Sequence, residues 1–187
     1  MKKLKYILFA ISLVTIFAFS KYNSQKNYTN DTELVWLTNL EEAQKISKKS
    51  KKPILANFTG SDWCGWCHKL TAEVFNTPEF KMWSDKNVIL LELDYPKRKE
   101  QTEAIKQQNL GLQQAFQIQG FPTIWVFNLD VDKATKKYNI TQIGKTGYVK
   151  GGSKAFTDQI DTMILQYKAQ SKIKKLEKTT DTKTIKS

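Results

Sequence analysis

The two cysteines of this 187-residue chain, Cys64 and Cys67, stand close together in the segment Trp63-Cys64-Gly65-Trp66-Cys67-His68-Lys69. Two thiols at this spacing can close a small disulfide ring and open it again with little movement of the backbone. Thiol–disulfide exchange needs one thiolate to attack and a second thiol close enough to resolve the mixed disulfide. The sequence therefore predicts an exchangeable disulfide in this segment.

The elements around the pair place it at the junction of a strand and a helix. Residues 54–58 form the pattern of a buried strand, and residues 70–75 form an apolar helical pattern. A thiol in the first turn of a helix lies near unpaired N–H groups and the positive end of the helix dipole, which lower its pKa. We therefore expect Cys64 to be the nucleophile and Cys67, one turn further on, to be the resolving thiol.

The N-terminus has the layout of an export signal. Three lysines in the first five residues precede an apolar run over residues 4–19, and small residues follow it. As a helix this run would reach about 24 Å, short of the ~30 Å hydrocarbon layer of a bilayer. We predict a signal peptide over residues 1–20, with an uncleaved anchor as the alternative, and a linker over residues 21–33. Export to the periplasm or envelope of a bacterium is the expected localisation.

Three other roles for the cysteines compete with exchange. A structural disulfide that closes so small a ring would remove only about 2 kcal/mol of unfolded-chain entropy, against about 4.7 kcal/mol for a 100-residue loop. A zinc site needs four ligands, and the two cysteines with the single His68 supply three. A chance pair of reduced, buried thiols does not suit an exported protein. Exchange is therefore the leading interpretation, and a structural disulfide comes next.

The net charge of +12 does not indicate a nucleic-acid-binding protein. Three positive charges belong to the start of the chain and a net five to residues 168–187, which leaves four for residues 21–167. Arg98 is the single arginine, and no basic motif interleaved with aromatic residues occurs. We interpret residues 168–187 as a basic, helical or disordered tail. The more specific hypothesis is that this tail associates weakly, and in a salt-sensitive way, with anionic membrane surfaces.

The rest of the chain alternates strands with helices, over residues 34–167. Strands are predicted at residues 34–37, 54–58, 88–94, 124–127 and 140–145, and helices at residues 39–47, 64–75, from 77 onward, 99–117 with a break at 109–111, and 156–167. A polar hairpin loop over residues 128–139 makes the last two strands antiparallel. This order describes an α/β fold in which helices flank a central mixed sheet.

The residues from Asp62 to Lys69, with Phe121-Pro122-Thr123 ahead of a later strand, resemble the thioredoxin superfamily. The resemblance is greatest to exported bacterial thioredoxin-like proteins with a Gly-Ser-Asp-Trp-Cys-x-x-Cys signature. It implies a thioredoxin fold for residues 34–167. It also implies that Pro122 is cis beside the disulfide and that the backbone at Phe121 pairs with an extended substrate segment. An ordinary turn proline is the alternative.

One position departs from the pattern of the family. Thioredoxins place a buried acid on the strand that leads to the motif, where it serves proton transfer for the resolving cysteine. Asn57 stands at that position in this chain, and an Asn side chain cannot take up a proton. A water molecule or a more remote acid would then have to assist Cys67, and Glu73 and Asp94 are the candidates. We expect thiol–disulfide exchange to persist without the buried acid, but its rate to depend on how Cys67 loses its proton.

The side chains beside the cysteines have separate expected roles. Packing explains Trp63, whereas Trp66, at a helix start, is expected to be exposed and to dock substrate. His68 is interpreted as a helix-surface residue, with tuning of the thiol pKa as the alternative. The dipeptide Gly65-Trp66 lacks both the histidine of isomerase-type motifs and the proline of ordinary thioredoxins.

These patterns predict a thiol–disulfide oxidoreductase that acts on protein thiols and disulfides through Cys64 and Cys67, with reduction favoured over oxidation. The expected substrate-binding residues are Trp66, Phe121 and Pro122. No organic cofactor, metal or nucleic acid is implied, and electrons would come from a partner dithiol, such as a membrane dithiol reductase. Two alternatives stay open: a non-catalytic adaptor module on the thioredoxin fold, and a dedicated thiol donor for haem-protein maturation.

Overall fold

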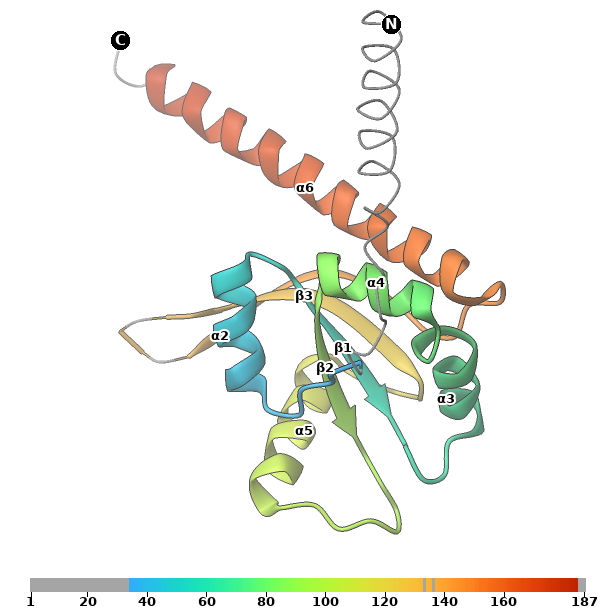
Figure 1. Ribbon diagram of the computed structural model, residues 1–187. Helices are drawn as coiled ribbons and strands as arrows, with labels where there is room; N and C mark the ends of the chain where they lie inside the picture. The colour runs from blue at the N-terminus through green and yellow to red at the C-terminus, as the bar shows by residue number, and fades with distance from the viewer. Residues whose placement is uncertain (1–33, 133, 136, 185–187) are drawn as a thin grey trace, which may run out of the picture. The chain divides into compact units, whose positions relative to one another are not determined.

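The computed structural model describes residues 34–184 of the chain except residues 133 and 136 (Figure 1). The elements are α2 (Leu40–Ser50), β1 (Ile54–Thr59), α3 (Gly65–Leu70), the π-helical turn η1 (Thr71–Phe75), α4 (Pro78–Asn87), β2 (Ile89–Asp94), α5 (Glu103–Ala115), β3 (Thr123–Val131), β4 (Tyr138–Thr146) and α6 (Gly152–Thr184). The signal peptide and linker predicted for residues 1–33 lie outside the described residues.

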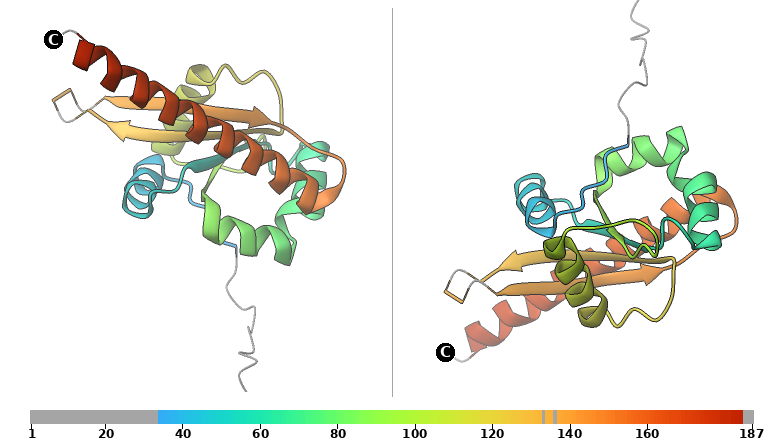
Figure 2. Two further views of the ribbon diagram at one scale, coloured as in Figure 1. Left: turned by 90° about the horizontal axis from the view of Figure 1, so that it is seen from above. Right: turned by 90° about the horizontal axis from the view of Figure 1, so that it is seen from below.

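The four strands form one mixed sheet in the order β2-β1-β3-β4. Strand β1 runs parallel to β2 and antiparallel to β3, and β3 pairs antiparallel with β4. All six residues of β1 are buried, as expected for a central strand with both faces covered. Figure 2 shows helices on both sides of the sheet. The predicted α/β fold with helices flanking a mixed sheet is confirmed.

Two apolar layers attach the helices to opposite faces of the sheet. One layer joins Phe58 of β1 to Leu40 of α2 and Leu112 of α5. The other lies under the remaining helices, and its buried members are Leu55, Leu70, Val74, Phe75, Phe80, Val88, Leu90, Ile124, Val126, Phe156, Ile160 and Ile164. Because successive strand residues point to opposite faces, β1 contributes to both layers. Helix α3, which follows the cysteines, belongs to the second layer.

Two helices begin at the capping residues that the sequence indicates. Asn39 Oδ1 accepts a hydrogen bond from Glu42 N at 3.0 Å at the start of α2. Thr77 Oγ1 accepts one from Phe80 N at 3.2 Å at the start of α4, where proline occupies the first turn. Helix α2 extends to Ser50, three residues beyond its predicted end.

The strand predicted at residues 34–37 is wrong. Within this described segment only Leu37 pairs, as an isolated parallel bridge with Leu91. Leu37 N donates to Leu90 O at 3.0 Å, and Glu92 N donates to Leu37 O at 2.8 Å. Since α2 begins three residues after the bridge, the segment is too short to continue a ladder along β2.

The break predicted at residues 109–111 is also wrong, because α5 runs through it. Gly111 is exposed there and costs about 1 kcal/mol relative to Ala, which is too little to end a helix that tertiary contacts hold. Asn109 is buried and its Nδ2 donates to Asp94 O at 2.9 Å. Tyr95 Oη donates to the carbonyl of Asn109 at 2.7 Å. These contacts keep the middle of the helix in place.

The last strands and helix extend beyond their predicted ends. Strand β3 reaches Val131 and β4 starts at Tyr138, so several polar residues predicted as loop are paired in the hairpin. Helix α6 buries Phe156, Ile160 and Ile164, as its periodicity predicts, and continues past residue 167.

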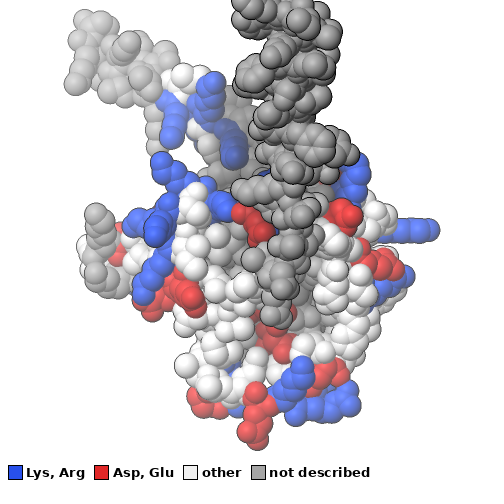
Figure 3. All heavy atoms as spheres, viewed as in Figure 1, with Lys and Arg blue, Asp and Glu red and all other residues white. Residues whose placement is uncertain are grey.

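The later part of α6 is exposed and rich in lysine, and Figure 3 shows cationic side chains gathered along it. Its exposed apolar side chains are Leu165, Ile173 and Leu176. Within the part of the chain that the structure describes, no helix is both long enough and apolar enough to cross a membrane.

Candidate functional site

The cysteine pair lies beyond the end of β1, where α3 begins. Cys64 and Cys67 form a disulfide, with their Cα atoms 5.2 Å apart. Cys64 is the N-cap of α3 rather than part of its first turn, and its Sγ accepts a hydrogen bond from Cys67 N at 3.2 Å. Both residues are buried, with 6% of Cys64 and 3% of Cys67 exposed. Cys64 is therefore the more accessible of the two, while the roles of attacking and resolving thiol stay predictions.

The turn before the cysteines is held by two carboxylates. Asp94, at the end of β2, accepts hydrogen bonds from Ser61 N at 2.8 Å and Ser61 Oγ at 2.6 Å. Asp62 accepts from the backbone N–H groups of Lys97 at 3.0 Å and Arg98 at 2.7 Å, and these bonds lower the pKa of Asp62. The loop after β2 is thereby fastened to the residues that precede the disulfide.

Trp63 fills the space between this turn and the loop after β2. Its Nε1 donates to Tyr95 O at 2.8 Å, and its ring meets Phe121 edge-on with centroids 5.7 Å apart. Lys97 Nζ lies 4.1 Å from the centroid of the indole. A Cβ on Gly60 would lie 2.6 Å from Trp63 Nε1, so the absence of a side chain at residue 60 lets the indole lie against the turn. Trp63 is thus packed against the turn, as the sequence indicates, while 37% of the residue stays exposed.

Trp66 projects into solvent, with 58% of the residue exposed. Its ring lies 5.2 Å from that of Tyr148, between β4 and α6, and Lys69 Nζ lies just over 5 Å from both ring centroids. Tyr148 Oη donates to Glu73 Oε2, and this bond raises the pKa of the Tyr148 hydroxyl. An aromatic pair made of the exposed Trp66 and the half-buried Tyr148, with a lysine beside it, therefore lies next to Cys67 in α3.

The peptide bond between Phe121 and Pro122 is cis, as predicted. The ring of Phe121 lies between those of Trp63 and Tyr95, with centroids 5.7 Å and 5.1 Å away. A Cβ on Gly147 would lie 3.2 Å from Pro122 O, so the chain after β4 passes close to this turn. The structure thus brings Phe121 to the Trp63 side of the motif, whereas Trp66 lies against Tyr148.

His68 lies on the surface of α3, as the sequence indicates, with its Nε2 2.8 Å from Ser61 O. This contact links the helix back to the turn before the cysteines. Among the described residues, no group of three or more His, Cys, Asp or Glu side chains is arranged to hold a metal ion.

Asn57 is buried in β1, and its Oδ1 has no hydrogen-bond partner among the described residues. The two acids that the sequence offers as helpers are both engaged elsewhere, since Asp94 accepts from Ser61 and Glu73 accepts from Tyr148. A third acid, Glu92, is the direct partner of Asn57 across the β1–β2 ladder. Burial and, second, the neighbouring Asp94 raise the pKa of Glu92.

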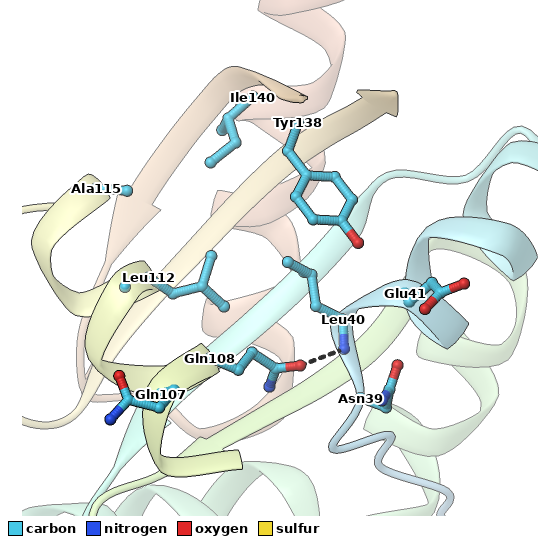
Figure 4. A pocket seen from close by; sticks show the side chains of 10 residues that line it. Asn39, Leu40, Glu41, Gln107, Gln108, Leu112, Ala115, Tyr138 and Ile140 are labelled. Carbon is cyan, nitrogen blue, oxygen red and sulfur yellow. Dashed lines mark hydrogen bonds between the residues drawn. The ribbon is translucent and has the colours of Figure 1, made fainter. Parts of the chain in front are cut away.

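A pocket of about 490 Å³ lies away from the motif, between the start of α2, α5 and the beginning of β4 (Figure 4). Its wall mixes apolar side chains such as Leu112 and Ile140 with the amides of Asn39 and Gln107. Gln108 Oε1 accepts a hydrogen bond from Leu40 N at 2.8 Å. This N–H group in the first turn of α2 therefore has a partner within the protein. None of the residues that line this pocket belongs to the cysteine-containing segment.

Four residues at the site escape prediction from the sequence: Tyr95, Lys97, Tyr148 and Glu92. Each lies on an element far along the chain from the cysteines. Tyr95 and Lys97 come from the loop after β2, and Tyr148 comes from the loop before α6. No local pattern in the sequence identifies them, because their relation to the motif arises from strand order and register.

The chain is similar in sequence to a known domain family and to known bacterial proteins. A family model described as a thioredoxin-like domain matches residues 40–138. The disulfide bond reductase DsbH of Chlamydia pneumoniae is 32% identical over 123 residues, which cover 66% of this chain and 69% of that protein. The thioredoxin-related protein DsbJ of the same organism is 31% identical over 165 residues, which cover 88% of this chain but 44% of that longer protein.

Solved structures agree with these matches. A structure described as DsbH oxidoreductase superposes with a TM-score of 0.63 at 29% identity, over 75% of this chain and 92% of that one. A thioredoxin from Thermus thermophilus superposes with a TM-score of 0.51 at 12% identity, over 72% and 90% of the two chains, and shows likeness of fold alone.

Proposed function

Since the chain belongs to the thioredoxin-like domain family and carries that family's disulfide at a helix start, we propose that it is a thiol–disulfide oxidoreductase that reduces disulfides in other proteins. The Cys64–Cys67 disulfide at the N-terminus of α3 is the observation that carries this proposal. The relative named as a disulfide bond reductase, at 32% identity, supports the direction of reduction.

The reaction begins with both cysteines reduced. The Cys64 thiolate attacks a substrate disulfide, a Cys64–substrate disulfide forms, and one substrate sulfur leaves as a thiolate. Cys67 then loses its proton and attacks Cys64 Sγ, which releases the second substrate thiolate and closes the Cys64–Cys67 disulfide. The two substrate thiolates take up protons, so one substrate disulfide is reduced and one protein dithiol is oxidised.

The surroundings of Cys64 supply what the first step needs. Cys64 is the N-cap of a helix, where backbone N–H groups and the helix dipole favour the thiolate. Trp66 is exposed and directly precedes Cys67, and Phe121, which precedes the cis bond to Pro122, packs its ring against Trp63. Trp66, Phe121 and Pro122 are the proposed contacts for an extended segment of the substrate protein.

The test is insulin reduction by the purified chain with dithiothreitol as electron donor. We expect turnover by the natural chain, none by Cys64→Ser, and a trapped mixed disulfide with Cys67→Ser. Full activity of Cys64→Ser would overturn the assignment. A reduction potential between about −120 and −270 mV fits exchange, whereas one below about −300 mV indicates the inert disulfide of an adaptor module.

The cellular setting is a further part of the proposal. We infer export to the envelope, with the electrons supplied by a partner dithiol such as a membrane reductase. The lysines at 168, 172, 174 and 175, beside the exposed Leu165, Ile173 and Leu176, support a salt-sensitive association of α6 with anionic lipid. Sedimentation with phosphatidylglycerol vesicles at low and high salt tests this association, and equal binding to neutral phosphatidylcholine vesicles would contradict it.

A further inference from the structure

Asn57 is a buried polar side chain that lacks a partner at the place where this chain departs from its family. It is 3% exposed, and its Oδ1 accepts no hydrogen bond from the described residues. An unpaired buried acceptor costs about 1–3 kcal/mol, so a donor is expected beside it. Its neighbours across the sheet are Ile124 on β3, which is apolar, and Glu92 on β2. Glu92 is therefore the neighbour in the sheet that can supply the donor.

Asn57 and Glu92 point to the same face of the sheet. Asn57 follows Leu55 by two residues and Glu92 follows Leu90 by two, and both leucines belong to the layer under α3. Paired residues on adjacent strands lie side by side on one face. Both polar side chains therefore face the α3 side, toward the end of β1 that leads to the cysteines.

Cys67 belongs to α3, which packs on the same face of the sheet through Leu70. It precedes Leu70 by almost one helical turn, and Leu70 packs in the same layer as Leu55. Strand β1 runs toward the turn that leads to the cysteines and α3 runs away from it, so Asn57 lies nearer that turn than Leu55 does, and Cys67 nearer than Leu70 does. Cys67 is also the more buried cysteine, so its proton needs an acceptor within the protein.

The carboxyl group of Glu92 suits this task. It is half-buried, and burial and then Asp94 raise its pKa, whereas Lys99 opposes the shift. A carboxyl group with a raised pKa holds a proton closer to neutral pH than a surface carboxyl group does.

The other charged groups near this face have partners of their own. From α3, His68 contacts the Ser61 carbonyl, and Lys69 lies over two aromatic rings. From η1, Glu73 accepts from Tyr148. Strand β1 and the adjoining residues 123–126 of β3 have no charged residues.

We propose that Glu92 replaces the buried acid that β1 lacks and takes up the proton of Cys67, while Asn57 positions its carboxyl group. In the resolving step the Cys67 S–H proton passes through one water molecule to the Glu92 carboxylate, and the thiolate attacks Cys64 Sγ. The substrate thiolate that leaves takes a proton from solvent. Protonation gives Glu92 an O–H donor, which is the kind of partner that the buried Asn57 Oδ1 lacks in the disulfide-bonded structure. This proposal rests on the proposed function.

A single turnover with dithiobis-nitrobenzoate separates the two steps. The reduced, full-length protein releases one thionitrobenzoate when Cys64 attacks and a second when Cys67 resolves the mixed disulfide, and both appear in absorbance. For Glu92→Gln we expect an unchanged first release and a second release slowed on the order of 100-fold, the lower end of general-base contributions. The rise of the second rate with pH should also lose the inflection that belongs to Glu92.

Two controls accompany this variant. Glu103→Gln removes an exposed acid of α5 that pairs with Lys106, and it should leave both releases unchanged. The exchange variant Asn57→Asp/Glu92→Gln moves the carboxyl group to β1 and the amide to β2 at nearly constant volume. It should recover most of the second rate, which a merely structural role of Glu92 would not produce.

The outcomes separate this proposal from the proposed function. A second release by Glu92→Gln at the natural rate, with the same pH profile, would overturn the role of Glu92 while leaving the oxidoreductase assignment intact. Failure of the exchange variant to recover the rate, with its melting temperature near that of the natural chain, would also overturn it. Loss of the first release in Cys64→Ser, in contrast, tests the proposed function alone.

Discussion

Gly60 lies directly against the indole of Trp63, so the change Gly60→Ala tests how closely the turn before the cysteines is packed. A Cβ at this residue would lie between 2.5 and 2.8 Å from three atoms of the indole. Carbon atoms in contact are separated by about 3.5–4.0 Å, so the ring must move. The backbone of the turn cannot easily retreat, because Cys64 N and Trp63 N both donate to Gly60 O.

The cost follows from the contacts that Trp63 would lose. The hydrogen bond from Trp63 Nε1 to Tyr95 O is worth about 0.5–1.5 kcal/mol. The edge-on contact with Phe121 is worth a further 0.5–1.5 kcal/mol or so. We therefore expect Gly60→Ala to lower the free energy of unfolding by about 2 kcal/mol, within the range for overpacked sites. For a domain of this size the melting temperature should fall by roughly 4–8 °C.

The assay is urea unfolding followed by tryptophan fluorescence, with Gly111→Ala as the matched control. A Cβ on Gly111 meets no atom within 4 Å, and this residue lies inside α5. The same chemical change should therefore stabilise the protein there, by about 0.5–1 kcal/mol.

A double-mutant cycle with Trp63→Ala identifies the cause of the loss. If the indole is the obstacle, Gly60→Ala should cost close to nothing in the Trp63→Ala background, which gives a coupling energy of about 2 kcal/mol. The reasoning is refuted if Gly60→Ala is as stable as the natural chain, or if its penalty is undiminished once the indole has been removed.

Two further predictions concern the interior. Since the raised pKa of Glu92 makes the folded chain hold a proton that the unfolded chain releases, stability falls as pH rises from the ordinary carboxyl pKa through the raised one. The melting temperature of Glu92→Gln, relative to that of the natural chain, should therefore rise as pH increases across this interval. Below the interval the difference between the two melting temperatures should stay constant. A difference that is the same at every pH would contradict this prediction. Phe156→Ala opens a cavity where α6 meets the sheet and should cost about 3–5 kcal/mol in urea unfolding, whereas Leu165→Ala, at an exposed residue of the same helix, should change stability by less than ~0.5 kcal/mol. A loss under about 1 kcal/mol for Phe156→Ala would show that α6 is not anchored there.

Much of the fold can be predicted from local pattern. The apolar run of β1, the caps at Asn39 and Thr77, and the period of Phe156 and Ile160 each depend on residues near one another in the chain. The strand predicted at residues 34–37 is cut short because α2 begins three residues after the Leu37–Leu91 bridge, whereas the break predicted in α5 fails because distant contacts hold the helix at Asn109. Propensity is worth about 1 kcal/mol or less per residue, and contacts with distant segments outweigh it.

Some residues of the site can likewise be predicted from the sequence, and others come together only in the tertiary structure. The Cys64–Cys67 pair is visible in the sequence itself, whereas the resemblance to thioredoxins predicts the cis bond before Pro122, which is confirmed, and points to Asn57 as the position of the missing acid, which stays a prediction. Only the tertiary structure brings Glu92 beside Asn57. A parallel pairing of β1 and β2 joins residues 35 apart in the chain, and a shift of one residue in its register would turn Glu92 to the opposite face. The burial that raises the pKa of the carboxyl group likewise arises only when helices pack upon that face of the sheet.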